Sequence, residues 1–464
     1  MSKVSTHPAT NVAGLSATLL TAVCALPAAA QPGGNTNAVA DGAYAAAATW
    51  DNGVPTGTTD AQMANGYTVT SSLNNSAFRI LLGDDPAGST GTLTIAGGIL
   101  GTDRAVSLGG FETASTGTGI LNIQSGGTLD VGLVGPGGAQ DIVVGDVANT
   151  TGILNLDGGT ANAAGFIIVG RVTDANGSAT GTLNQTAGDI NSLQLRIGGN
   201  ATGTHNFDGG TVNNRFYSLG VGPLGSGTTN QSAGTLTAEG INVGDNGSGT
   251  YNMTGGTVNQ TAANLGIIIG GLGVNANGTF DQSGGTVTAT NLRVGNGNDS
   301  TGTLTLSGDA TIRFTSLDIA SELGLAGNTA SNVTGTLNLN GPDVTITGTD
   351  LDANGSANTA ALNWLVDDGG VSTISLLGAA DLTGALLGME EDAGENVAFG
   401  STFTLIDGQS ITGGFVDNSA AYDFAIVSGG SGQQLIATNV VPEPGTVVLL
   451  SLGGLALAAR RRKA

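Results

Sequence analysis

The chain has 464 residues, of which 81 are glycine, 10% are charged and 39% are hydrophobic. The hydrophobic content excludes a pure Gly/Ser linker, the low charge excludes a highly charged disordered chain, and glycine without a three-residue period excludes collagen. The 12 basic and 35 acidic residues give a net charge of −23. Such an acidic surface is repelled by phosphate backbones, which excludes nucleic-acid binding. A polar, turn-rich, all-β chain fits this composition.

Residues 1–30 have the layout of a secretory signal peptide. Lys3 is followed by an apolar stretch from Leu15 to Leu26 and then by small residues, with Ala28 and Ala30 at the positions expected for cleavage. We therefore expect export by the Sec machinery and processing by signal peptidase. The alternative, a first helix of the fold, has too short an apolar run to span a membrane. Cys24 is the only cysteine and lies in this segment, so the processed chain can form no disulfide or cysteine-based metal site.

Residues 31–90 are β-like and are followed by an internal repeat over residues 91–340. The phrase Gly-Thr-Leu-Asn-x-x-Gly-Gly recurs ten times with drift, about every 27 residues. It begins at Gly91, Gly119, Gly152, Gly181, Gly203, Gly227, Gly249, Gly278, Gly302 and Gly335. Each unit has three short β-type runs separated by turn residues, which is typical of one coil of a parallel β-solenoid. The variable spacing places the insertions in turns.

The alternation of side chains along a strand assigns a face to each position of the phrase. The third and fifth positions are mostly apolar and are predicted to form the core. The fourth position points outward, and stacking of the coils aligns it into a row of amides that can bond along the rod. Its members are Asn122, Asn155, Asn184, Asn206, Asn230 and Asn252, then Asp281 and Thr305 as interruptions, then Asn338.

Residues 341–440 lose the phrase but remain β-like. A solenoid exposes strand edges at both ends, and these edges need covering segments. We therefore predict an N-terminal cap over residues 31–90 and a C-terminal β-rich cap over residues 341–440. The predicted fold is an all-β parallel β-helix of about ten three-strand coils with two caps, plus short helices in the signal peptide and in the C-terminal tail.

Residues 441–464 combine three features in a fixed order. Pro442, Glu443 and Pro444 precede an apolar stretch, and the chain then carries Arg460, Arg461 and Arg462. This tail resembles the PEP-CTERM sorting signal of exported bacterial proteins. The resemblance implies processing by a membrane exosortase and delivery to the envelope surface or extracellular matrix of a Gram-negative-type bacterium. The short apolar helix would contact the membrane only before processing; the alternative is an ordinary tail anchor.

The repeats resemble the autotransporter-type β-strand repeats of large passenger proteins, although residues 341–464 are not expected to form the translocator barrel of that family. Without both ends the chain would keep seven arginines, no lysine and 34 acidic residues, a net charge of −27. β-Helices also include polysaccharide lyases and hydrolases, which use arginine or lysine bases or paired carboxylates.

Five residues are candidates for catalysis, and each has a simpler structural interpretation. Arg196 and Arg293 share a repeat position, and the simpler interpretation is that they are strand residues whose side chains point outward. Asp157 and Asp208 also share a position and could form a carboxylate pair, but turn capping beside Gly-Gly is the simpler interpretation. His205 replaces a core leucine and is predicted to be a packed core residue. We therefore predict no catalytic residue.

Several turns are rich in oxygen ligands, and Asp245 and Asp299 are candidates for weak Ca²⁺ binding. Tight turns that need positive φ explain the same residues without a ligand. No other cofactor or metal site is predicted.

The sequence thus predicts an exported structural or adhesive rod, not an enzyme, that contacts extracellular polysaccharide (exopolysaccharide) or neighbouring cells. The alternative is a β-helix enzyme or binding protein acting on acidic extracellular polysaccharide. A third possibility is a passive spacer, which would bind no glycan.

Overall fold

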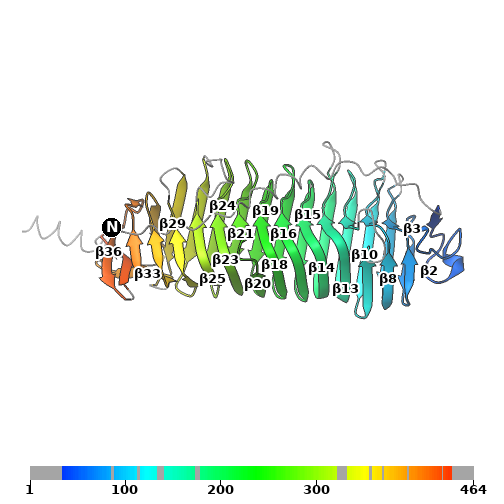
Figure 1. Ribbon diagram of the computed structural model, residues 1–464, viewed down its shortest axis with the longest axis horizontal. Helices are drawn as coiled ribbons and strands as arrows, with labels where there is room; N and C mark the ends of the chain where they lie inside the picture. The colour runs from blue at the N-terminus through cyan, green and yellow to red at the C-terminus, as the bar shows by residue number, and fades with distance from the viewer. Residues whose placement is uncertain are drawn as a thin grey trace, which may run out of the picture.

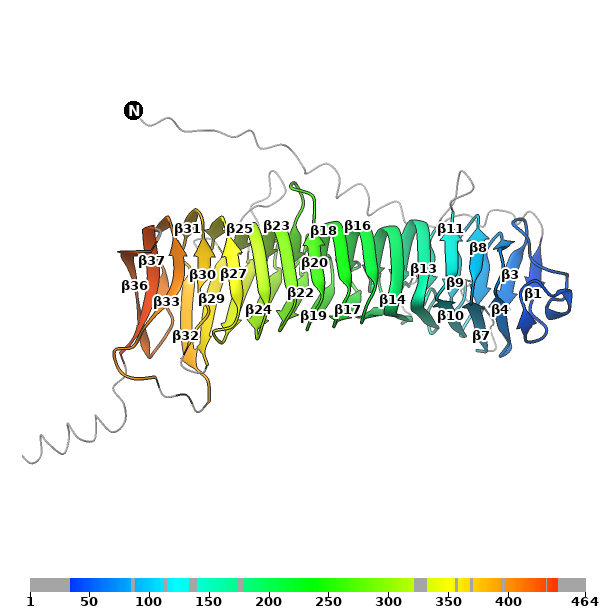
Figure 2. The same ribbon diagram turned by 90° about the horizontal axis from the view of Figure 1, so that it is seen from below.

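The protein forms a straight rod of stacked coils, which Figures 1 and 2 show from two sides. The computed structural model describes residues 34–84, 88–111, 115–132, 140–172, 178–320, 332–354, 358–367, 370–393, 395, 397–430 and 432–440. About 13 coils stack along the axis, and strands make up 61% of the chain. The predicted all-β parallel β-solenoid is confirmed. The predicted signal and tail helices lie outside the described residues.

Each full coil contributes strands to three parallel sheets. In the first sheet the order is β2 (Gly42–Ala43), β4 (Thr68–Ser71), β7 (Thr90–Ile95), β10 (Thr118–Gln124), the starts of β13 (Thr151–Val169) and β14 (Thr180–Ile197), β15 (Thr202–Phe207), β17 (Ser226–Gln231), β19 (Ser248–Met253), β22 (Asn277–Gln282), β24 (Thr301–Ser307), β26 (Thr334–Asn340), β29 (Thr359–Val366), β32 (Leu386–Glu391) and β35 (Val416–Asp417).

The second sheet contains β5 (Asn75–Ala77), β8 (Gly98–Thr102), β11 (Gly127–Val131), the middles of β13 and β14, the first halves of β16 (Thr211–Leu219) and β18 (Thr235–Val243), β20 (Thr257–Gln260), the first halves of β23 (Thr286–Val294) and β25 (Thr311–Ile319), β27 (Thr345–Gly348), β30 (Ile374–Leu376) and β33 (Thr402–Gly408).

The third sheet contains β1 (Asn35–Asn37), β3 (Asp60–Met63), β6 (Ile80–Leu82), β9 (Val106–Leu108), β12 (Ile142–Val144), the ends of β13, β14, β16 and β18, β21 (Ile267–Ile269), the ends of β23 and β25, β28 (Asp350–Asp352), β31 (Ala379–Asp381) and β34 (Ser410–Thr412).

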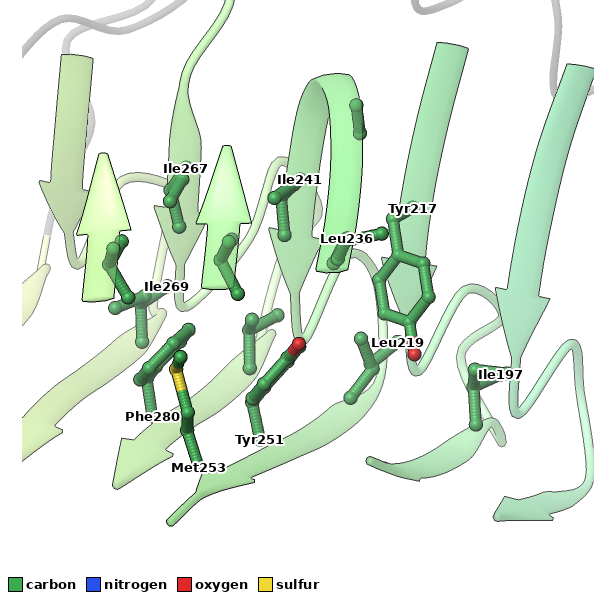
Figure 3. Close-up of a cluster of buried hydrophobic side chains, with 14 of the residues drawn as sticks. Ile197, Tyr217, Leu219, Leu236, Ile241, Tyr251, Met253, Ile267, Ile269 and Phe280 are labelled. Carbon is green, nitrogen blue, oxygen red and sulfur yellow. The ribbon is translucent and has the colours of Figure 1, made fainter. Parts of the chain in front are cut away.

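The core runs along the rod axis between the three sheets. The third and fifth positions of the phrase point into it, as predicted, and Leu154 and Leu183 are fully buried. Aromatic side chains stack along the axis in the middle of the rod, where the rings of Tyr251 and Phe280 lie 4.7 Å apart and nearly parallel. Figure 3 shows Tyr251 and Phe280 among the isoleucines and leucines of neighbouring coils. Like residues therefore bury one another, and the repeat itself builds the core.

Two glycines meet at the corner where the third sheet passes into the first. The first ends the third strand at positive φ, as at Gly145 and Gly244, and the second opens the phrase, as at Gly152 and Gly249. A Cβ on Gly152 or Gly249 would collide with the backbone nitrogen of the corner glycine just before it. The phrase therefore begins with glycine because two backbone segments touch there.

The N-terminal end of the rod is closed by the residues around Trp50. The Trp50 ring packs edge-on against Tyr44, and its Nε1 donates to the Tyr44 carbonyl at 2.8 Å. The carboxylate of Asp51 accepts from the backbone N–H of Asn37 on β1 at 2.8 Å, and the Tyr44 hydroxyl donates to the carbonyl of Ser76 on β5. These groups occupy the hydrogen-bonding edges of the first strands. A 3₁₀ turn over Ala47–Thr49 carries the chain into this region.

Behind this end lies a buried ion pair. The guanidinium Nε of Arg79 donates to the Asp60 carboxylate at 3.0 Å, and the Asp60 side chain has no exposed surface. The pair ties β3 to the segment that precedes β6.

The C-terminal end of the rod has a different construction. Here β33 pairs in parallel with β30 and antiparallel with β37 (Gly432–Asn439), and β37 pairs antiparallel with β36 (Tyr422–Gly429). Figure 2 shows β36 at the end of the rod. The parallel winding thus ends in an antiparallel hairpin.

The coils extend beyond the ten phrases on both sides. β29 stacks on β26 and β32 on β29 in register, although Ala360 occupies the place of the phrase glycine Gly335. At this corner Ala320 replaces the usual turn glycine and also has positive φ. The solenoid therefore has more coils than the phrase alone indicates, because strand stacking tolerates loss of the sequence signature.

Candidate functional site

An amide ladder runs along the outer face of the first sheet, as the sequence predicts. Each Nδ2 donates to the Oδ1 of the preceding coil at 2.8 to 3.0 Å, from Asn155 to Asn122 and onward through Asn184, Asn206 and Asn230 to Asn252. After the interruption, Asn363 donates to Asn338 at 2.9 Å and so adds a coil that the phrase did not indicate. The ladder uses its own amides for bonding between coils, which is a stabilising arrangement.

A second, shorter ladder lies on the outer face of the second sheet. Asn162 donates to Asp130 at 2.6 Å, Asn191 to Asn162 at 2.9 Å, and Asn213 to Asn191 at 3.2 Å. Sequence reasoning missed this row, although the aligned second run of each unit held the signal. Two sheets of the rod are thus joined coil to coil by side chains as well as by backbone.

His205 lies inside the rod, as predicted, and has no exposed surface. Its Nδ1 is 2.8 Å from the hydroxyl of Tyr217, which in turn lies 2.7 Å from the hydroxyl of Thr229. The Nε2 atom has no hydrogen-bond partner. Burial lowers the pKa of His205 to about 3, so its imidazole is neutral at physiological pH.

Two buried glutamines, Gln231 and Gln185, also make hydrogen bonds inside the rod. The hydroxyl of Tyr251 donates to Gln231 Oε1 at 2.6 Å, and the Gln231 amide donates to the carbonyls of Gly234 and Thr257. Gln185 bonds the carbonyls of Gly188 and Thr211 in the same way. Each glutamine thus bonds a glycine of its own coil and the first residue of a second-sheet strand in the next coil.

Charged residues gather on the outer face of the third sheet and at the corner that follows it. Arg171 pairs with Asp146, whose other oxygen accepts from Ser107 at 2.9 Å. Arg196 lies over the ring of Phe166, 4.2 Å from its centroid, and its Nη2 donates to Gln194. The guanidinium groups of Arg171 and Arg196 thus each contact other side chains of the protein.

Further along the same face, three aspartates occupy successive coils. Asp318, Asp352 and Asp381 are in register, and Arg293 lies 3.6 Å from Asp318. Burial, followed by the charges of Asp318 and Asp381, raises the pKa of Asp352, while the Asn354 N–H lowers it. Insertions of different length hide this column in the sequence. Asp318 also accepts from Ser316, and Asp381 from the N–H and hydroxyl of Thr383, so these carboxylates already have partners.

The candidate carboxylate pair is not brought together. Asp157 lies on β13 and Asp208 follows β15, so the coil of β14 separates them. Asp157 accepts from the hydroxyl of Thr186 at 2.8 Å, and Asp208 from that of Ser232 at 2.6 Å. Each carboxylate ties one turn to the next.

Neither of the two turn aspartates that are candidates for Ca²⁺ binding belongs to a group of three possible metal ligands among the described residues. Asp299 has φ of 52° and accepts from Asn332 at 2.9 Å. Burial raises the pKa of Asp245 to about 6, against a smaller opposing influence of Arg196. Over the described part of the chain, no three His, Cys, Asp or Glu side chains are grouped to hold a metal ion.

The predicted processing residues lie outside the described residues at both ends, namely Ala28, Ala30, Pro442, Glu443, Pro444, Arg460, Arg461 and Arg462. In the part of the chain that is described, no helix has the length and apolarity needed to cross a membrane. Comparison with curated proteins and with solved structures gave no match.

A family model does match the end of the chain. It is the PEP-CTERM protein-sorting motif, and it covers residues 440–463, directly after β37. The predicted sorting signal is thereby confirmed as a motif, which implies exosortase-dependent export to the cell surface in Gram-negative bacteria. The chain is a β-solenoid rod that carries a PEP-CTERM sorting motif at its C-terminus.

Proposed function

We propose that this protein is a structural and adhesive rod of the cell envelope surface or extracellular matrix, and that it has no catalytic role. The observation that carries the proposal is the combination of a long solenoid joined by side-chain ladders with a C-terminal sorting motif. The ladders favour stiffness, since they add side-chain bonds between successive coils over much of the rod. The resemblance of the repeats to autotransporter passenger repeats agrees with display outside the cell.

The net negative charge of the chain and the pairing of its arginines with acidic residues weigh against the alternative of an enzyme or binding protein for acidic polysaccharide. Such a ligand needs cationic side chains, and lyase chemistry needs a free base. Arg79, Arg171, Arg215 and Arg293 each face an Asp or Glu. The net charge of −23 repels polyanions further. The proposed ligands are therefore neutral surface glycans, which the amide- and hydroxyl-rich faces can hydrogen-bond.

Sorting is tested by replacing Pro442, Glu443 and Pro444 together with alanine. Immunogold labelling of intact cells should then fall, while a chain with the exposed Glu239→Ala change should be displayed as the unmodified chain is. Equal surface labelling of all three proteins would contradict sorting through this motif.

The adhesive and non-catalytic parts are tested with purified polysaccharides. We expect sedimentation with neutral glycans and none with uronate-rich glycans. Release of new reducing ends or unsaturated uronates would contradict the non-catalytic proposal, and no binding to any glycan would reduce the role to that of a spacer.

A further inference from the structure

The two ends of the rod treat their strand edges differently. At the N-terminal end, Asp51 and Tyr44 bond the free edges of β1 and β5. At the C-terminal end, β36 pairs along its whole length with β37, and within the described residues it pairs with no other strand. An edge strand presents backbone N–H and C=O groups that can bond another strand.

The strand β36 has few of the features that usually protect an edge. Its sequence, Tyr-Asp-Phe-Ala-Ile-Val-Ser-Gly, contains no lysine, no proline and one charged residue, Asp423. Its register with β37 shows no bulge. Natural edges are generally protected by several such features, so a regular, mostly apolar edge with a single charge indicates a surface that can pair.

Apolar side chains surround this edge. Phe403, Phe415, Phe424 and Ile426 are only partly buried against the end of the core. Phe399 is 61% exposed, and the N–H of the next residue, Gly400, donates to the carbonyl of Asn439 at the end of β37. The C-terminal end of the rod thus has partly exposed apolar side chains beside a strand edge without a partner strand among the described residues. At the N-terminal end, by contrast, Trp50 is only 4% exposed.

We propose that the C-terminal end of the rod is a self-association surface, on which β36 of one copy pairs antiparallel with β36 of a second copy around a two-fold axis. An antiparallel two-fold pairing places one residue opposite itself. With Ala425 at the axis, Phe424 faces Ile426 and Asp423 faces Val427 of the second copy. Aromatic and β-branched residues then pair on one side, and no carboxylates oppose each other.

A second copy fits this edge better than the chain's own tail does. The residues after Val440 contain Pro442 and Pro444. Each proline lacks the N–H that a strand partner must donate, so the first part of the tail is a poor strand. The negative charge of the rods disfavours contact along their lengths, and contact at the ends keeps most of that charge apart.

The pairing is tested by disulfide crosslinking in the full chain carrying Cys24→Ser, which removes its one natural cysteine. Ala425→Cys places two cysteines opposite each other, about 5 Å apart between Cβ atoms. The matched control is Ser428→Cys on the same strand. Its two cysteines would lie six residues apart along the pair, about 20 Å, beyond the reach of a disulfide. We expect a covalent dimer from Ala425→Cys alone.

The second measurement is the mass of the unmodified chain and of two Ala425 variants by light scattering. Ala425 is exposed, so Ala425→Lys should preserve the fold while placing two like charges at the axis. We expect a concentration-dependent dimer for the unmodified chain and for Ala425→Ser, and a monomer for Ala425→Lys. A monomeric unmodified chain without the 425 crosslink, equal crosslinking at 425 and 428, or a dimeric Ala425→Lys protein would each overturn the proposal.

Discussion

Replacing His205 with leucine should flatten part of the dependence of stability on pH. Leucine stands at the aligned position of the preceding coil, Leu183, so the change restores an ordinary core residue. Tyr217 keeps a partner in Thr229 after the change. Because the buried Nε2 of His205 has no partner, we expect the variant to be at least as stable as the natural chain at pH 7.5.

The magnitude follows from the difference between the folded and unfolded pKa of His205. The folded value is about 3 and the ordinary value 6.5, so the unfolded chain binds a proton first as the pH falls. Stability is therefore fully present above pH 6.5 and is lost progressively toward pH 3. At pH 4.5, two units below the ordinary value, the loss is about 2.7 kcal/mol.

Asp245 has the opposite effect over an overlapping range. Its folded pKa of about 6 exceeds its ordinary value of 3.8, so the folded chain binds the proton first, and stability rises as the pH falls from about 6 to 3.8. The pH dependence of the natural chain therefore combines opposing parts. The difference between the natural chain and His205→Leu isolates the histidine, since the only other histidine is His7 in the predicted signal peptide.

The assay is urea unfolding followed by far-UV circular dichroism at pH 7.5 and 4.5. Hydrogen exchange of the amides in β15 and β16 adds a local measure, because solenoids can unfold coil by coil. The advantage of His205→Leu should grow by about 2.7 kcal/mol on acidification. An advantage that is the same at both pH values would refute the assignment of a neutral, buried imidazole.

Three further substitutions test the rod's construction through the free energy of unfolding in urea. Gly249→Ala should destabilise the chain by about 3 kcal/mol, because its Cβ meets backbone, whereas Gly101→Ala, with nothing within 4 Å, should change stability little. Asn230→Ala removes one donated and one accepted amide bond and should cost about 2 kcal/mol; a change near zero would show that the ladder contributes no stability. Arg79→Ala removes the cationic partner of the buried Asp60 carboxylate and should cost about 3 to 5 kcal/mol, against less than about 1 kcal/mol for the exposed pair of Arg215; equal costs would contradict the burial argument.

The sequence predicts the coil and its core because both depend on local periodicity. The alternation in the phrase correctly placed Leu154 inside and Asn155 outside. The first amide ladder followed from this alternation, since identical positions in stacked coils must be neighbours. His205 was placed correctly for the same reason, although its bond to Tyr217 joins positions on different strands and needed the structure.

The remaining features depend on alignment between coils, which turn insertions obscure. The aspartate column at Asp318, Asp352 and Asp381 joins coils of unequal length, so equal spacing does not reveal it. The prediction of a C-terminal cap over residues 341–440 rests on loss of the phrase, whereas β29 and β32 continue the stacking with Ala360 in the place of the phrase glycine. Backbone pairing needs compatible strands more than a fixed signature, so structure persists where the pattern fades.

The amides of the first ladder all donate toward the N-terminal end of the rod. No member needs a partner beyond the coil on either side of it. If one whole coil is duplicated or lost in evolution, the two coils that become neighbours can therefore form the same amide hydrogen bond. The reach of such a protein from the cell can change in steps of one coil, about 4.8 Å, while both ends keep their contacts.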